Sequence, residues 1–249
     1  MRQLGVRRNE PIVAGFPTPE TVVDDRREPG VSVGSAKSYS TLAALLEAVR
    51  GCRARERHLP LGPRPVLQAG TTARVLVVGQ APVARAHATG VPWDDASGER
   101  LRIWMAVDKQ AFYDASRIAI IPIGYCYPGR GKGGDLPPRG ECAELWLDLL
   151  MAMLPRIELT LLVGWHAQRH FLGCRRKRSL AATVGAWREY GPQYLPLPHP
   201  SPRNQPWLKR NAWFEQQLIP ALQDRIREAC SRPVARSGRS PGALAACAS

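Results

Sequence analysis

The chain has 249 residues and a formal net charge of +14, because 35 Lys and Arg side chains stand against 21 Asp and Glu. With 44% hydrophobic and 22% charged residues, the composition is typical of one globular α/β domain with extensions. No apolar run reaches the roughly 18 residues of a membrane span, and the basic start leads into no apolar signal core, so we expect a cytoplasmic protein. The excess of cations favours a polyanionic partner such as nucleic acid.

Strand and helix patterns alternate along the chain after an irregular start. Residues 1–35 show no sustained apolar period and are predicted to be an arm or loop region; residues 36–228 form the predicted domain, and residues 229–249 a flexible basic tail. Continuous apolar, β-branched runs predict buried strands at 74–78, 117–122, 159–163 and 194–197. Helical spacing predicts helices at 42–51, 101–112, 141–154, 165–172 and 207–227.

This alternation predicts a mostly parallel sheet with helices on both faces. In such sheets functional residues collect in the loops beyond the carboxyl ends of the strands. The segments that follow Val78, Pro122, Val163 and Leu197 are therefore where we expect a site.

Three segments carry a recognisable combination of motifs. Residues 79–82 (GQAP) follow the first strand, residues 89–98 (TGVPWDDASG) precede a helix, and residues 199–204 (HPSPRN) follow the last strand. Together they resemble the uracil-DNA glycosylase superfamily from about Gly51 to Arg227, most closely its families four and five, while HPSPRN is similar to the single-strand-selective monofunctional glycosylases.

The resemblance implies a fold and an activity. The fold would be a three-layer α/β/α sandwich around a central four-stranded, mainly parallel sheet. The activity would be base excision repair: uracil is flipped out of DNA and its N-glycosidic bond is hydrolysed, leaving an abasic site and free uracil. We expect a monomer that binds DNA containing uracil or an abasic site and no membrane, in the bacterial cytosol or nucleoid.

The resemblance assigns catalytic roles to four residues. His199 would donate a hydrogen bond to uracil O2 as the bond breaks. Asp95 matches the family-five carboxylate that positions the water, with Asp94 second and Gln80 a neutral helper, because Gln80 and Ala81 replace the carboxylates of other families. The alternative is that Asp95 or a neighbour only caps the following helix.

The resemblance assigns base binding to a second set of residues. Trp93 occupies the place of the aromatic residue that stacks on uracil in family four, and a buried core Trp is the alternative. The Asn that reads the uracil edge is missing after the second strand, so backbone amides or Tyr125 would have to replace it. The predicted substrate-binding residues are Gly79, Ala81, Trp93, Tyr125 and Ser201.

DNA contacts are predicted at two basic places. Arg203 and Asn204 lie in the HPSPRN segment, where Arg203 would enter the minor groove or fill the gap left by the flipped base. Arg175, Arg176, Lys177 and Arg178 form a run without an acidic residue. Such a run suits DNA phosphates, and a solvated surface is the alternative.

Three cysteines match ligand positions of the iron–sulfur cluster of families four and five. These are Cys52, Cys126 and Cys142, but the fourth position holds Arg55. A cubane cluster needs four thiolates or a substitute. We therefore expect no cofactor, with a [4Fe-4S] cluster as the less favoured alternative.

Three functional hypotheses remain open. The leading one is a monofunctional uracil-DNA glycosylase, since no Lys in the motifs could form an imine. The missing Asn leaves open another damaged base, and the missing carboxylate at Gln80 and Ala81 leaves open a non-catalytic module that binds uracil or abasic sites.

Overall fold

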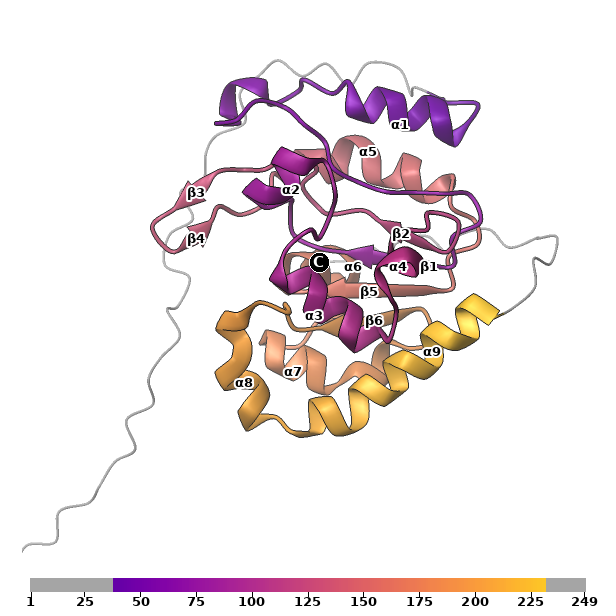
Figure 1. Cartoon of the computed structure of the whole chain (residues 1–249), viewed down its shortest axis with the longest axis vertical. Helices are drawn as coiled ribbons and strands as arrows, with labels where there is room; N and C mark the ends of the chain where they lie inside the picture. The colour runs from indigo at the N-terminus through magenta and orange to yellow at the C-terminus, as the bar shows by residue number, and fades with distance from the viewer. Residues whose placement is uncertain (1–37, 232–249) are drawn as a thin grey trace, which may run out of the picture. The chain divides into compact units, whose positions relative to one another are not determined.

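A four-stranded parallel sheet forms the centre of the protein. The computed structural model describes residues 38–231, so the predicted arm 1–35 and the tail beyond residue 231 lie outside the described part. The strands β1 (Val75–Val78), β2 (Ile118–Ile120), β5 (Leu159–Val163) and β6 (Tyr194–Leu197) follow the order β2-β1-β5-β6, with every neighbouring pair parallel (Figure 1). The predicted three-layer α/β fold is confirmed.

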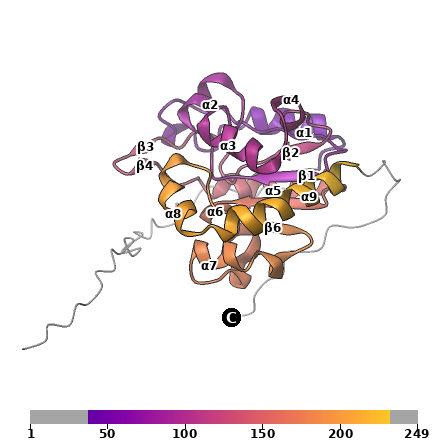
Figure 2. The same ribbon diagram turned by 60° about the horizontal axis from the view of Figure 1, so that its bottom comes forward.

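Two separate hydrophobic cores cover the two faces of the sheet. Because successive strand residues point to opposite faces, Leu76 and Val78 join one core and Val75 and Val77 the other, and all four are fully buried. The first core is completed by α1 (Leu42–Arg50), α5 (Glu141–Ala152) and α6 (Trp165–Leu172). The second is completed by α3 (Ala96–Met105), α4 (Lys109–Phe112), α7 (Leu180–Gly185), α8 (Gln205–Arg210) and α9 (Ile219–Ser231) (Figure 2).

The helix pattern differs from the sequence prediction in four places. The predicted helix 101–112 is two helices, because Ala106 adopts a left-handed conformation and the Asp108 side chain caps α4 by accepting from the Ala111 N–H at 2.7 Å. The predicted helix 207–227 is interrupted at Asn211, continues as a π-helix at Phe214–Leu218 and ends only at Ser231, so residues 229–231 are helical rather than tail. The short α2 (Ala84–Thr89) and α7 were not predicted.

The carboxyl ends of the strands form one edge of the sheet. There Gln168, fully buried on α6, donates to the carbonyl oxygens of Leu162 (3.3 Å) and Leu197 (2.9 Å) and thus joins the ends of β5 and β6. A small hairpin of β3 (Arg130–Gly131) and β4 (Gly134–Asp135), also not predicted, projects from this edge beside α2 (Figure 1). Across residues 38–231, no helix is long and apolar enough to cross a membrane.

Candidate active site

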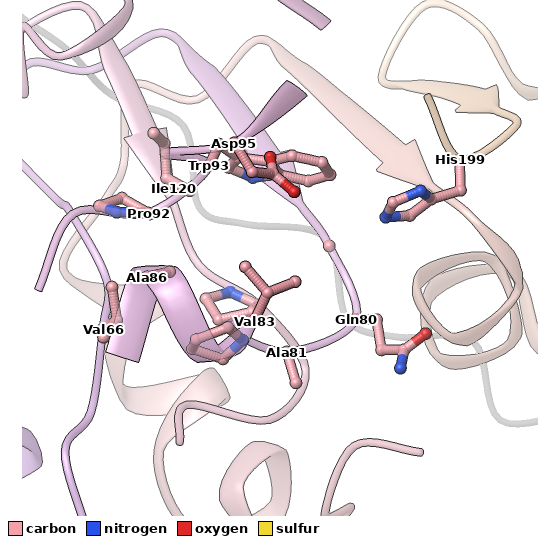
Figure 3. A pocket seen from close by; sticks show the side chains of 13 residues that line it. Val66, Gln80, Ala81, Val83, Ala86, Pro92, Trp93, Asp95, Ile120 and His199 are labelled. Atoms are coloured by element: carbon pink, nitrogen blue, oxygen red, sulfur yellow. The ribbon is translucent and has the colours of Figure 1, made fainter. Parts of the chain in front are cut away.

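A cavity at the carboxyl end of β1 brings the three sequence motifs together. Figure 3 shows His199 and Gln80 at one end, Trp93 and Asp95 in the middle, and Val66, Pro92 and Ile120 at the far end. The cavity encloses about 40 Å³, much less than the roughly 150 Å³ void in which a protein binds one benzene ring. A flat base would therefore need more space than the cavity offers in this conformation. The lining residues are Val66, Gly79, Gln80, Ala81, Pro82, Val83, Ala86, Pro92, Trp93, Asp95, Ile120, Pro122 and His199.

His199 is held in a defined tautomer by its own loop. The Ser201 N–H donates to Nδ1 of the imidazole at 3.2 Å, and the Asn204 side-chain amide donates to the His199 carbonyl oxygen at 2.7 Å. Since Nδ1 accepts, the proton of the neutral ring resides on Nε2. The imidazole projects into the cavity (Figure 3). His199 therefore offers a single N–H donor to whatever lies there.

Burial keeps that imidazole neutral. It lowers the pKa of His199 below the ordinary value of 6.5, and the nearby Asp95 carboxylate opposes part of this shift. In this respect His199 resembles the neutral histidine of other enzymes in which an uncharged imidazole stabilises a developing oxyanion.

Trp93 is positioned by an uncommon backbone conformation. Its φ of 56° lies in the left-handed region, which non-glycine residues rarely adopt. The following turn is tight, because a Cβ on Gly98 would lie 1.8 Å from the Trp93 carbonyl oxygen. The indole packs over Gly79, where a Cβ would come within 2.9 Å of Cζ2, and it stacks on His199 with ring centroids 5.5 Å apart. Trp93 is thus half-buried, forms a wall of the cavity and also packs against the second core.

Asp95 has a structural role and a site role at once. One carboxylate oxygen accepts from the Gly98 N–H at 2.8 Å and caps α3. The side chain also lines the cavity and acts on the pKa of His199. Capping and catalysis, treated as alternatives from the sequence, are compatible because a carboxylate has acceptor capacity left after one hydrogen bond.

Asp94, predicted as the second choice of carboxylate, does not line the cavity. It forms an ion pair with Arg85 at 3.4 Å and lines a separate depression with Lys109 and Tyr113. Asp95 is in an extended conformation (φ −152°), in which neighbouring side chains point to opposite sides. Asp95 is the one carboxylate that lines the cavity in the described part of the chain.

Gly79, Gln80 and Ala81 line the cavity as predicted. The Gln80 side chain donates to the carbonyl oxygen of Leu136 at 3.2 Å, next to the β3–β4 hairpin. The carbonyl oxygens of Gly79 and Gln80 accept from Ile123 (3.0 Å) and Gly124 (2.9 Å). These bonds fix the first loop against the segment that follows β2.

Tyr125 and Ser201 do not contact the cavity. Tyr125 is 2% exposed and packs in the core with Ala143 and Leu147, and burial raises the pKa of its hydroxyl. Its prediction as a substrate-binding residue is wrong, because the chain turns its side chain inward after Gly124. Ser201 instead supports His199 through its N–H, while its hydroxyl accepts from the Arg203 N–H at 3.3 Å.

The apolar half of the cavity was missed from the sequence. Val66, Ile120 and Ala86 come from the loop before β1, the end of β2 and the unpredicted helix α2. No local motif marks these residues, since apolar side chains of this kind also fill cores. The one nearby clue in the sequence was that Pro82 and Val83, which also line the cavity, directly follow the GQA segment.

The residues predicted to contact DNA lie in different surroundings in the structure. The Asn204 side chain donates to the His199 carbonyl oxygen and so supports that loop, while exposed Arg203 donates to the Gly133 carbonyl oxygen at 2.8 Å. An acidic side chain lies next to the basic run in the folded protein, because Lys177 forms an ion pair with Glu189 at 2.5 Å. Arg175 stacks over Tyr190, Arg176 stacks over Trp165 at 3.7 Å, and Arg178 is exposed.

Cys52, Cys126 and Cys142 line one small cavity together with Arg55. Arg55 forms an ion pair with Glu141 at 2.9 Å, and burial raises the pKa of Cys126 to about 11 and that of Cys142 in the same direction. Within residues 38–231, no group of three or more His, Cys, Asp or Glu side chains is placed to hold a metal ion. Arg55 offers no thiolate, so these three cysteines supply one ligand fewer than the four that a cubane cluster needs.

Comparisons with known proteins agree with the fold and the motifs. The family model of the uracil DNA glycosylase superfamily matches residues 67–223, which include all three motifs of the cavity. The chain therefore belongs to the uracil DNA glycosylase superfamily, a family of DNA glycosylases. A solution structure from Methanosarcina acetivorans, named a "putative uracil DNA glycosylase", is similar at 13% identity and a TM-score of 0.38, covering 65% of this chain and 98% of that one.

The surroundings of His199 predict how it titrates. Because burial favours the neutral ring and Asp95 favours the charged one, the imidazole should take up its proton only below pH 6.5, and Asp95→Asn should lower that midpoint further. Asp94→Asn is the control, since Asp94 faces away, and should leave the midpoint unchanged. Nitrogen-15 NMR of the imidazole measures all three, and a midpoint at or above 6.5 in the parent would contradict the assignment.

Proposed function

We propose that the protein is a monofunctional uracil-DNA glycosylase that acts as a monomer in the cytosol or nucleoid. The observation that carries the proposal is the pairing of a neutral imidazole donor, His199, with the carboxylate of Asp95 across one cavity. Hydrolysis of an N-glycosidic bond needs both, because negative charge develops on the departing base while positive charge develops on the sugar.

The reaction follows from these two groups. A flipped base stacks on Trp93, and Nε2–H of His199 donates to uracil O2 as the bond between C1′ and N1 breaks. Asp95 stabilises the sugar cation and orients a water, whose oxygen bonds to C1′ and whose proton is released. Uracil leaves as an anion that solvent protonates. No lysine lines the described cavity, so water rather than an amine is the nucleophile.

The far end of the cavity favours a second candidate substrate. Val66, Pro92 and Ile120 offer no side-chain hydrogen bond to the edge of a base. Such an end selects by shape, and apolar pockets discriminate between similar ligands by only about 1–3 kcal/mol. A different damaged base is therefore the alternative substrate, and excision assays on a panel of modified bases separate the two. A binding module without catalysis would show no multiple turnover on any of them.

Replacement of the donor tests the mechanism. His199→Ala should slow single-turnover excision of uracil by about 10² to 10³, the effect of removing one oxyanion donor, with little change in DNA binding. Quenched-flow measurement with enzyme in excess gives this rate. A variant that cleaves as fast as the parent would remove His199 from the mechanism.

Replacement of the carboxylate separates capping from catalysis. Asp95→Asn retains a side-chain oxygen that can accept from the Gly98 N–H but loses the charge, so excision should slow at least about tenfold, equivalent to roughly 1.4 kcal/mol of barrier, while the thermal midpoint stays close to that of the parent. Asp94→Asn is the matched control and should retain the parental rate. Equal rates for Asp95→Asn and the control would show that another group holds the water.

We also propose that activity needs no iron–sulfur cluster, because Arg55 replaces the fourth ligand. Protein purified without oxygen should show no absorbance near about 400 nm and no stoichiometric iron. Arg55→Cys, which restores a fourth thiol, serves as the positive control for cluster uptake on reconstitution. About four irons per parental chain would contradict the proposal.

A further inference from the structure

The β3–β4 hairpin is the part of the carboxyl edge that the proposed mechanism leaves without a role. It projects beyond the sheet on the same edge as the cavity (Figure 1). Its tip presents Lys132 and Gly133 to solvent, and Arg130 on β3 is exposed as well. A projecting, cationic hairpin beside the proposed DNA site is placed to bind an anionic ligand.

The hairpin is joined to both loops of the candidate active site. Gln80, which lines the cavity, donates to the Leu136 carbonyl oxygen just after β4 at 3.2 Å. Arg203, in the His199 loop, donates to the Gly133 carbonyl oxygen at the hairpin tip at 2.8 Å. The hairpin therefore lies on the rim of the cavity, at a place fixed by main-chain acceptors.

Glycines allow this close approach. Gly134 has a φ of +138°, and a Cβ there would lie 2.8 Å from Nη1 of Arg203. Gly133 has open space around it. Gly residues let the backbone of a tip come close to a ligand such as a phosphate, while Arg203 is held alongside.

The charges of this rim are mostly positive. Arg130, Lys132 and Arg203 stand against one carboxylate, Asp135, which is the ladder partner of Arg130. Paired residues of an antiparallel ladder share a face, so Asp135 offsets part of the charge of Arg130. Lys132 at the tip and Arg203 beside it carry the rest.

We propose that the β3–β4 hairpin is a second DNA-binding element, which contacts the phosphodiester backbone next to the flipped nucleotide through Lys132 and Arg130. The proposal rests on the proposed function for the identity of the partner. Contacts of this kind add affinity and orientation without reading sequence. They also place Arg203 beside the strand that carries the flipped base.

The test is the salt dependence of binding by the full chain to a duplex with a stable tetrahydrofuran abasic analogue. Removing the interaction with one phosphate should reduce the slope of log affinity against log salt by about 0.9. Lys132→Gln should therefore lower the slope by about 1, and Arg130→Gln with Lys132→Gln should weaken binding about fivefold near 100 mM salt.

Matched controls come from exposed cations outside the hairpin and the His199 loop. Lys109 on α4 and Arg117, just before β2, are exposed, and their Gln variants should bind as the parent does. Asp135→Asn should tighten binding, because it removes the acid beside Arg130. The proposal is overturned if Lys132→Gln and the double variant bind like these controls, or if Asp135→Asn weakens binding.

Excision by the parent is measured in parallel on a uracil duplex. If the parent excises uracil while the hairpin variants match the controls in binding, the hairpin proposal alone fails. If the parent excises no base but the hairpin variants show lower affinity and a smaller slope, the proposed glycosylase function fails while the DNA-binding hairpin stands.

Discussion

The geometry of the site depends on the turn between Trp93 and Gly98. Trp93 is held in a left-handed conformation, which costs on the order of 1–3 kcal/mol. The Asp95 cap on Gly98 and the hydroxyl of Tyr113, which donates to the Pro92 carbonyl oxygen at 2.9 Å, hold the turn in place. Only a glycine fits at position 98, where the Trp93 carbonyl oxygen fills the space of a side chain. The same turn directs Trp93 and Asp95 into the cavity and Asp94 out of it, so one backbone conformation selects the carboxylate.

The opposite wall is fixed by different means. His199 follows β6 between two prolines, which leave few backbone conformations to its loop, and Ser201 and Asn204 hold its ring and carbonyl. Residues 93 and 199 are far apart in the chain. They meet because β1 and β6 run parallel on either side of β5, so their carboxyl ends share one edge. Burial then makes the imidazole a neutral donor and strengthens its effect on a developing charge.

Much of this architecture could be predicted from the sequence, and the failures have physical reasons. The four strands were evident because buried parallel strands are continuous apolar runs. The motif after the last strand located His199, and the motif before a helix located Trp93 and Asp95. Side-chain direction was not predictable. Whether Tyr125 faces the core or the cavity, or Asp94 faces in or out, depends on single backbone torsions that propensities do not encode. The hairpin was missed because a glycine-rich segment with two-residue strands has no apolar alternation.

In the proposed mechanism, catalysis and base selection are carried by different halves of the cavity. The polar half, His199 and Asp95, would act on atoms common to every pyrimidine nucleotide, the O2 oxygen and the sugar. The far half touches the edge that distinguishes one base from another, and there Val66, Pro92 and Ile120 provide shape without side-chain hydrogen bonds. Sites that hydrogen-bond a substrate reject analogues far more strongly than apolar pockets do. Because His199 and Asp95 would not contact that edge, the proposed mechanism assigns specificity to the fit of the base against the apolar wall and to the energy of flipping, which is lowest for a mismatched or damaged base.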